Sequence, residues 1–247
     1  MSKGWLFLFP KTKSGLILFP LKTKSRNSLN MKTSIARKIL MALSGFFLLV
    51  FLLQHLTINS LSVISEESFN SVSHFMGYNP VVQFVLQPIL IFGVVFHLIM
   101  GLYLDVLNKK ARTQKYANNN PAASSSWMSR NMVITGLTVL AFLGLHFYDF
   151  WAAEIKYKYI DFAAEDPSRY FHELQHKFVD VWRVALYCVS FVLLSLHLMH
   201  GFQSAFQSVG FRHNTRTPII QKLGNIYAVA VPLGFIFIAL FHYITQL

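Results

Sequence analysis

Four histidines lie inside long apolar segments of this chain, where a titratable side chain is unusual. They are His55, His97, His146 and His197, and each occupies the later part of its own segment. An ionisable side chain within a membrane span costs free energy, so such a residue indicates a functional site. Four of them at matching positions therefore predict a shared chemical role.

Imidazole is a common axial ligand of haem iron, and two histidines on one iron leave no open position for oxygen. The four histidines can form two such pairs, so we expect them to hold two haems b. His200 is an alternative to His197, because it lies three residues further along the same segment. A glycine follows four residues after both His97 and His197, at Gly101 and Gly201, and this shared spacing favours His197.

The composition places the chain in a membrane. Of its 247 residues, 54% are hydrophobic and only 13% are charged, and the mean hydropathy is +0.45. Such a chain is too apolar for an ordinary soluble domain. The single cysteine, Cys188, excludes an iron–sulfur cluster within the chain, since a cluster takes about four cysteine ligands. The net charge of +12 does not indicate a nucleic-acid partner, because the basic residues flank apolar segments and fit a role in membrane orientation.

Five segments are apolar enough to cross a lipid bilayer, which takes about 20 residues of helix. The sequence predicts spans at about 39–61, 81–107, 131–152, 180–207 and 219–244. We expect an all-α membrane domain over residues 32–247, in which the first four helices form a bundle around two stacked haems b. Residues 1–31 are basic and contain two nearly identical short motifs, so we expect a disordered or surface-lying extension, with Met31 as an alternative start.

Charge asymmetry predicts the orientation of the spans. The first 38 residues hold nine Lys or Arg and no acid, and the linkers after the second and fourth spans are also basic. The other two linkers are acidic on balance. Because basic loops face the cytoplasm, we expect the amino terminus inside and the carboxyl terminus outside. His55 and His146 then lie near the outer surface and His97 and His197 near the inner one, at levels roughly 15–20 Å apart in a core of about 30 Å.

Local patterns around the histidines repeat. Ser44-Gly45 begins eleven residues before His55, and Thr135-Gly136 begins eleven residues before His146. Eleven residues are about three helical turns, so both hydroxyl groups should face the bundle interior at the level of the inner haem. Haem propionates need hydrogen-bond donors or cations. We expect haem contacts from Ser44, Gly93, Gly101, Arg130, Thr135 and Gly201, with Ser44 and Arg130 on the inner propionates.

Taken in order, these motifs resemble those of a known family. They are Ser44-Gly45 before His55, FHLIMGLY around His97, Thr135-Gly136 and LGLHFYDFW leading to and around His146, and LHLMHGFQSAFQ around His197. Over about residues 32–245 the chain is similar to the five-helix, di-haem cytochrome b membrane anchors of succinate:quinone and quinol:fumarate oxidoreductases. Residues up to about 31 are not covered by the resemblance.

The resemblance implies a complex in a bacterial inner membrane, with a flavoprotein and an iron–sulfur protein docked on the cytoplasmic side. Succinate is oxidised on the flavoprotein, and electrons pass through the inner and then the outer haem to a quinone, with menaquinone expected. Ser195 stands where fumarate-reducing members can carry a glutamate, which favours the succinate-oxidising direction. Residues on the outer side are candidates for quinone binding or proton transfer, namely His74, Tyr148, Asp149, Trp151 and Glu154.

Two other functions stay open from the sequence. The first is the di-haem b subunit of another quinone-linked dehydrogenase, such as a hydrogenase or a formate dehydrogenase, although the order of the motifs fits these less well. The second is a haem-free transporter that uses the histidines as proton or metal relays. The spans hold almost no acidic residues and show no inverted repeat of broken helices, which disfavours a transporter.

Overall fold

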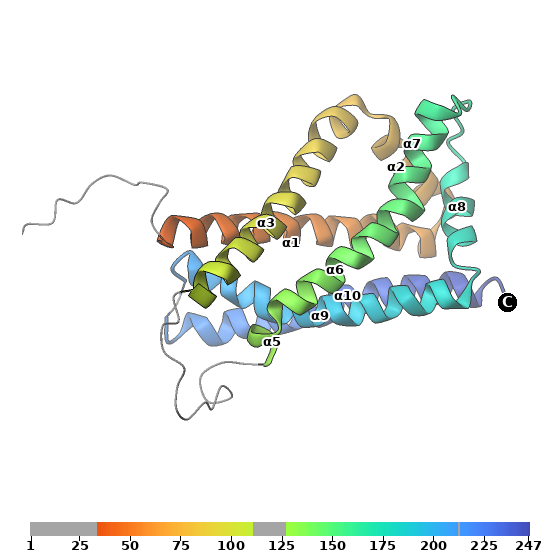
Figure 1. Cartoon of the computed structure of the whole chain (residues 1–247). Helices are drawn as coiled ribbons and strands as arrows, with labels where there is room; N and C mark the ends of the chain where they lie inside the picture. The colour runs from red at the N-terminus through yellow and green to blue at the C-terminus, as the bar shows by residue number, and fades with distance from the viewer. Residues whose placement is uncertain (1–33, 111–126, 212) are drawn as a thin grey trace, which may run out of the picture. The chain divides into compact units, whose positions relative to one another are not determined.

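The computed structural model describes residues 34–110, 127–211 and 213–247. Within these ranges every regular element is a helix, and five helical segments are long and apolar enough to cross a membrane (Figure 1). This confirms the predicted all-α class and its five spans, and the chain is a multi-pass membrane protein. The extension expected at residues 1–31 lies outside the described residues.

The five spans are built from the following helices. The first is α1 (Ser34–Ile64), and the second joins the π-helical turn η1 (Val82–Leu86) to α3 (Gln87–Lys110). The third runs through α6 (Met132–His146), η2 (Phe147–Trp151), α7 (Ala152–Ile155) and η3 (Lys156–Ile160), after the short helix α5 (Trp127–Arg130). The fourth is α9 (Val181–Ser208) and the fifth is α10 (Arg216–Ile244).

The third span is longer than predicted, because its helix continues beyond residue 152 to Ile160. Two π-helical turns accommodate the extra length, and wide turns of this kind often occur at functional sites. The first of them begins directly after His146 and turns Asp149 inward, where only 1% of the residue is exposed. A similar turn, η1, precedes Pro88, whose ring nitrogen cannot donate a hydrogen bond to the preceding turn.

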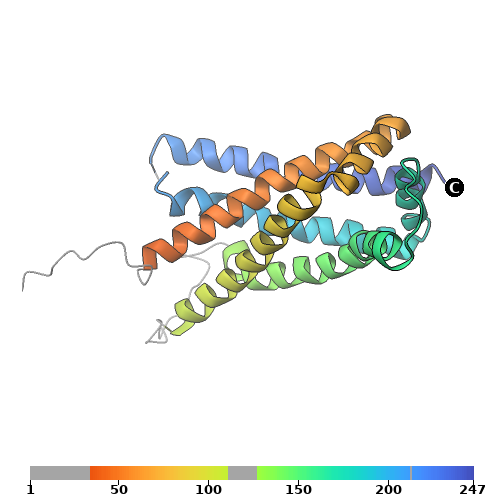
Figure 2. The ribbon, with the colours of Figure 1, turned by 90° about the horizontal axis from the view of Figure 1, so that it is seen from above.

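The two acidic linkers contain helices of their own, which were not predicted from the sequence. They are α2 (Glu66–Tyr78) and α8 (Arg169–Lys177), and both lie with α7 and the carboxyl terminus at one end of the bundle (Figures 1 and 2). Ser65 caps α2 by accepting a hydrogen bond from the backbone N–H of Ser68. The backbone N–H of Phe171 donates to Oδ1 of Asn70 over 2.8 Å, which ties α8 to α2. We call this end, with α2, α7 and α8, the cap end.

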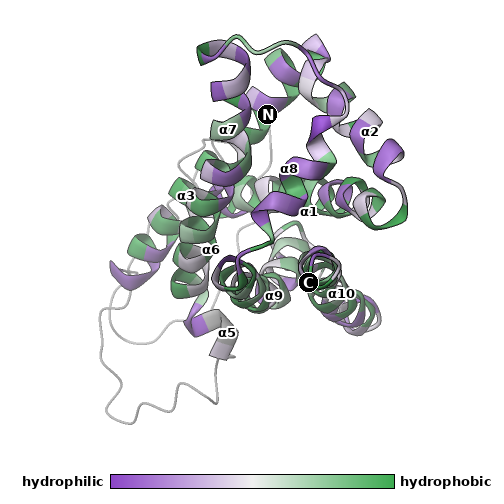
Figure 3. Ribbon diagram, turned by 90° about the vertical axis from the view of Figure 1, so that its right-hand side faces the viewer, coloured by the Kyte–Doolittle hydropathy of each residue, from purple (hydrophilic) through white to green (hydrophobic). Residues whose placement is uncertain are grey.

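Helix α10 packs along α9 and α1, and this contact holds the densest part of the core. Val184 and Phe191 of α9 meet Val231, Phe235 and Ala239 of α10 in one buried cluster. The hydroxyl of Tyr227 donates to the carbonyl oxygen of Leu49, which joins α10 to α1. Helix α3 and the third span lean away from this core (Figure 3). The long helices carry mostly hydrophobic residues, whereas hydrophilic residues gather on α2 and α8.

Candidate functional site

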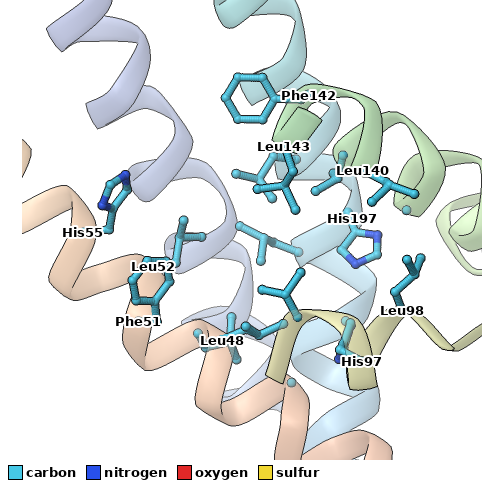
Figure 4. Close-up of a pocket in the computed structure, with 18 of the residues that line it drawn as sticks. Leu48, Phe51, Leu52, His55, His97, Leu98, Leu140, Phe142, Leu143 and His197 are labelled. Carbon is cyan, nitrogen blue, oxygen red and sulfur yellow. The ribbon is translucent and has the colours of Figure 1, made fainter. Parts of the chain in front are cut away.

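A cavity of about 620 Å³ lies within the bundle and is lined from α1, α3, α6 and α9, with part of one wall from α10. This volume falls in the range of about 300–1,000 Å³ that small-molecule and cofactor pockets occupy. Its lining is mostly apolar, with leucine and phenylalanine the most frequent residues, and it includes His55, His97 and His197 (Figure 4) as well as His146 and His200. The four histidines that the sequence singled out are therefore among the few polar side chains of this apolar space, together with residues such as Asn59 and Tyr187.

The histidines meet in two pairs. The rings of His55 on α1 and His146 on α6 face each other with centroids 5.6 Å apart and planes at 87°. The rings of His97 on α3 and His197 on α9 have centroids 6.4 Å apart and planes at 68°. Figure 4 shows His97 and His197 together, with His55 on the other side of the cavity. These are the pairings expected from the sequence.

The spacing within each pair can be compared with that of two ligands on one metal ion. A histidine nitrogen lies about 2.0–2.1 Å from a bound zinc ion, and iron is of similar size. Two such nitrogens on opposite sides of a metal are about 4 Å apart, which places the ring centroids about 6 Å apart. Ring separations of 5.6 Å and 6.4 Å lie on either side of this value, so in each pair the two rings are close enough for both imidazoles to reach one metal ion.

Each histidine of the His97–His197 pair is held by a hydroxyl from a neighbouring helix. Oγ of Ser44 on α1 lies 3.0 Å from Nδ1 of His97, and Oγ1 of Thr135 on α6 lies 3.4 Å from Nδ1 of His197. The sequence placed Ser44 and Thr135 at the level of this pair. It assigned the Ser44 hydroxyl to a propionate, whereas the structure shows it against an imidazole.

The other pair has a different environment. Nδ2 of Asn59, one turn further along α1, lies 3.4 Å from Nδ1 of His55 and donates to the carbonyl oxygen of His55 over 2.8 Å. Nδ1 of His146 is buried without a hydrogen-bond partner among the described residues. Sequence reasoning did not include Asn59, although its spacing of four residues from His55 places it on the same helix face.

Of the remaining predicted haem contacts, two line the cavity and two lie outside its lining. Gly101 and Gly201 line the cavity, as does His200, but the ring that faces His97 belongs to His197. A Cβ on Gly93 would lie 2.5 Å from Cε1 of Phe47, so this glycine permits a close approach of α3 to α1 outside the cavity lining. Arg130 is exposed at the end of α5, also outside the cavity lining.

Asp149, a predicted proton-transfer candidate, is engaged in a buried ion pair. Its carboxylate binds Arg183 through Oδ1 and accepts a hydrogen bond of 2.8 Å from the hydroxyl of Tyr187 through Oδ2. The Asp149 side chain is fully buried and that of Arg183 is 28% exposed. Tyr187 also lines the cavity, and its ring centroid is 6.5 Å from that of His146. The sequence alone does not show which residues of α9 lie opposite Asp149. Arg183 and Tyr187 could therefore not be predicted as partners of this carboxylate.

Glu154, another candidate, lies in an ionic network at the cap end. Lys158 binds it over 2.6 Å, and Arg169 of α8 binds both Glu154 and Glu173. Burial lowers the pKa of Arg169, but its hydrogen bonds to the two carboxylates outweigh this and leave the pKa above its usual value. The pKa of Tyr170 is raised by burial and then by the charge of Glu154. These charges are therefore arranged to fasten α8 to the end of the third span.

The last three candidates of the outer side differ in exposure. Nε2 of His74 contacts Glu165 over 2.9 Å, and its ring stacks on Tyr78 with centroids 4.7 Å apart. Tyr148 is 70% exposed, pointing away from the core, and Trp151 is 45% exposed while also lining the cavity. Of the five candidates, Trp151 is the one that reaches both the cavity and the surface of the bundle.

His242 lies near the carboxyl-terminal end of α10, outside the two histidine pairs. It is fully buried, and its Nε2 lies 2.8 Å from Oγ of Ser62 on α1. The Ser62 hydroxyl also contacts the carbonyl oxygen of Asn59 over 2.7 Å. Ser62 of α1 and Phe171 of α8, whose ring centroid lies 5.6 Å from that of His242, pack against this end of α10.

Together, five membrane-spanning helices and two facing histidine pairs in one apolar cavity define a multi-pass protein with paired histidine side chains in its interior. Residues 20–120 match the family of the succinate dehydrogenase/fumarate reductase transmembrane subunit. The succinate dehydrogenase cytochrome b558 subunit of Bacillus subtilis (strain 168) is 29% identical over 102 residues, which are 40% of this chain and 46% of that relative.

The match thus spans less than half the length of the relative. Both comparisons confirm the resemblance of the chain to the cytochrome b membrane-anchor subunits of succinate dehydrogenases. No solved structure matches the chain.

Proposed function

We propose that the chain is the membrane-anchor cytochrome b subunit of a succinate dehydrogenase, and that it passes electrons through two haems b to a quinone. The observation that carries the proposal is the presence of two facing histidine pairs in a single apolar cavity. His55 and His146 would hold one haem, and His97 and His197 the other.

The residues of the cavity suit a haem better than a bare metal ion. Among the described residues there is no group of three or more His, Cys, Asp or Glu side chains that could surround an ion. Each pair offers two imidazoles only, so the other ligands of an iron must come from a flat macrocycle, and the leucine and phenylalanine lining suits its apolar faces. A bound haem supplies an iron that alternates between the ferrous and ferric states and so carries one electron.

Charge supports an orientation for electron flow. Basic residues cluster where α1 begins and α3 ends, with Arg37, Lys38, Lys109 and Lys110 at that end of the bundle (Figure 1). The positive-inside rule assigns this basic end to the cytoplasm. His97 contacts Ser44 in the early part of α1, so the His97–His197 pair lies nearer the basic end. A flavoprotein and an iron–sulfur protein would dock there, in a bacterial inner membrane.

The quinone would be reduced towards the opposite, cap end. Trp151 lines the cavity close to His146 in sequence and is also exposed on the bundle, where a lipid-soluble quinone such as menaquinone can approach. Asp149 and Glu154 are held in ion pairs, so we propose structural roles for both rather than proton transfer. His74, which contacts Glu165 at the cap end, is a remaining candidate that could exchange a proton with water.

Purification of the chain with the proteins that bind it tests this function. We expect a flavoprotein and an iron–sulfur protein in the complex, and a visible spectrum with about two haems b per chain and a sharp α band after reduction. His97→Ala and His197→Ala should each remove the inner haem and stop succinate from reducing the outer one. A colourless preparation would overturn the haem proposal, and a haem-containing complex without a flavoprotein would point to another quinone-linked dehydrogenase.

A further inference from the structure

Two pairs of neighbouring helices, α1 with α3 and α6 with α9, are joined near the basic end by the same set of residues. One helix of each pair carries Met-x-x-Ser/Thr-Gly, and the other carries His-x-x-x-Gly. The first joint consists of Met41, Ser44, Gly45, His97 and Gly101, and the second of Met132, Thr135, Gly136, His197 and Gly201. We call each of these two residue sets a histidine cradle.

In the first cradle the Ser44 hydroxyl has two neighbours. It lies 2.8 Å from the carbonyl oxygen of Met41 and 3.0 Å from Nδ1 of His97. A Cβ built on Gly45 would lie 3.7 Å from Cε1 of His97, so the imidazole rests directly against the backbone of α1. A Cβ on Gly101 would lie 3.4 Å from Cε of Met41, which closes the joint one turn further on.

The second cradle repeats these contacts between α6 and α9. The Thr135 hydroxyl lies 3.0 Å from the carbonyl oxygen of Met132 and 3.4 Å from Nδ1 of His197. A Cβ on Gly136 would lie 3.4 Å from Cε1 of His197, and one on Gly201 would lie 3.6 Å from Cε of Met132. Two helix pairs far apart in the sequence thus hold their histidines with equivalent groups.

The hydrogen-bond pattern of a cradle selects one tautomer of its histidine. A hydroxyl donates a single hydrogen, and a backbone carbonyl oxygen can only accept. Both contacts of Ser44 are therefore satisfied only if Oγ donates to Met41 and accepts from a protonated Nδ1 of His97. The same reasoning applies to Thr135 and His197. In that tautomer Nε2 carries the lone pair that can bind a metal.

The outer pair has no cradle. The position that follows His55 by four residues is Asn59, which contacts Nδ1 of His55 from the same helix. The equivalent position after His146 is Phe150, and Nδ1 of His146 has no partner within the described part of the chain. The internal repeat is therefore kept at the inner pair and broken at the outer pair.

We propose that Ser44 and Thr135 are positioning residues that hold His97 and His197 in the Nδ1-protonated tautomer, so that both histidines present Nε2 to the same iron. This inference rests on the proposed function, since it assumes that the inner pair binds a haem. Gly45 and Gly136 leave the space in which the two imidazoles lie. The hydroxyl groups therefore act through the histidines and need not contact the propionates.

The proposal has a measurable electronic consequence. A histidine ligand whose second nitrogen donates a hydrogen bond becomes more basic, and a more basic ligand stabilises ferric iron. Loss of the acceptor should therefore raise the midpoint potential of the inner haem and weaken haem binding by about 10- to 100-fold. Both hydroxyl groups should act on the same haem, because they hold the two ligands of one iron.

The test compares single variants of the purified complex by redox titration and by electron paramagnetic resonance of the ferric haems. Ser44→Ala and Thr135→Val remove one acceptor each, while Ser44→Thr and Thr135→Ser keep it. Ser60→Ala and Thr138→Val are matched controls, because these hydroxyl groups also bond to a carbonyl oxygen of their own helix without contacting a histidine.

We expect Ser44→Ala and Thr135→Val to shift the potential and the resonance signal of the same haem, with the other haem unchanged. The conservative variants and both controls should retain wild-type values. Two normal haem signals in Ser44→Ala and Thr135→Val, or shifts in different haems, would overturn the cradle while leaving the proposed function intact. Absence of haem from the wild-type complex would instead reject the proposed function itself.

Discussion

A histidine that binds a metal uses one ring nitrogen and must satisfy the other, and the four paired histidines of the cavity would meet this demand differently. His97 and His197 have a hydroxyl from the next helix, and His55 has an amide from its own. His146 has no partner for Nδ1 among the described residues. A histidine in an apolar span is thus constrained by the hydrogen-bond partner of one ring nitrogen as well as by the group that the other nitrogen could bind.

The choice between His197 and His200 can be tested at the level of single residues. Both line the cavity, but the ring opposite His97 belongs to His197. We expect His200→Ala to retain both haems and His197→Ala to lose one, as counted by the pyridine haemochrome assay on the purified complex. Loss of a haem from His200→Ala, with retention in His197→Ala, would transfer the ligand role to His200.

The buried carboxylate of Asp149 should matter for stability. If its charge is removed, Arg183 loses its ion-pair partner and the Tyr187 hydroxyl donates to a weaker acceptor. Breaking a buried ion pair from one side costs about 3–5 kcal/mol, and the partial exposure of Arg183 places Asp149→Asn at the lower end, about 3 kcal/mol. The measurement is the denaturant midpoint at which the α band is lost.

A double variant separates the ion pair from other effects of the substitution. Asp149→Asn combined with Arg183→Gln removes both charges, so part of the lost stability should return. If the double variant were as unstable as the sum of the single ones, the two side chains would not be coupled. Succinate-driven reduction rates, measured on the same samples, would show whether Asp149 has any role beyond packing.

At the scale of helices, the amino-acid pattern predicted the spans and the pairing of their histidines, but not the other contacts between elements. Long apolar segments and the spacing of Ser44 from His55 are local features, so they can be derived from one sequence. The partners of Asp149 and the burial of His242 depend on the register between helices, which no local pattern contains. The helix α8 was missed because it is short and mostly polar, and its packing on α2 stabilises it.

At the cap end the backbone of α2 lies close to side chains of α8 and of the third span, and Gly77 permits this close approach. A Cβ on Gly77 would lie 2.8 Å from the Tyr170 hydroxyl oxygen and 3.2 Å from both Glu154 Oε1 and Lys158 Nζ. We expect Gly77→Ala to cost about 1–3 kcal/mol through overpacking and to loosen α8 from the third span. Limited proteolysis of the segment at residues 161–168 measures this.

Gly144 provides the matched control for that substitution. A Cβ on Gly144 would meet nothing within 4 Å, so Gly144→Ala should leave the protease sensitivity of the cap end at its wild-type level. In a helix interior the change to alanine also lowers the conformational entropy of the unfolded chain, which stabilises by about 0.5–1 kcal/mol. Equal sensitivity of both variants would show that crowding at Gly77 does not control the cap end.

At the scale of the whole molecule, the orientation of the bundle would decide which histidine pair receives electrons and which delivers them. The pair near the basic end would receive electrons and the pair near the cap end would deliver them. Nothing in the pairs themselves requires this direction, because both consist of two facing imidazoles in one cavity. The distribution of charge at the two ends therefore carries the functional asymmetry.

Cysteine labelling in intact cells tests the orientation directly. The single natural cysteine, Cys188, can be replaced by serine, and one new cysteine placed at an exposed site of either end. Glu67→Cys lies on α2 at the cap end, and Asn214→Cys lies in the turn between α9 and α10. An impermeant thiol reagent should label Glu67→Cys in intact cells and Asn214→Cys only after the membrane is opened. The reverse pattern would exchange the inner and outer haems and reverse the proposed path of electrons, while leaving the pairing of the histidines unchanged.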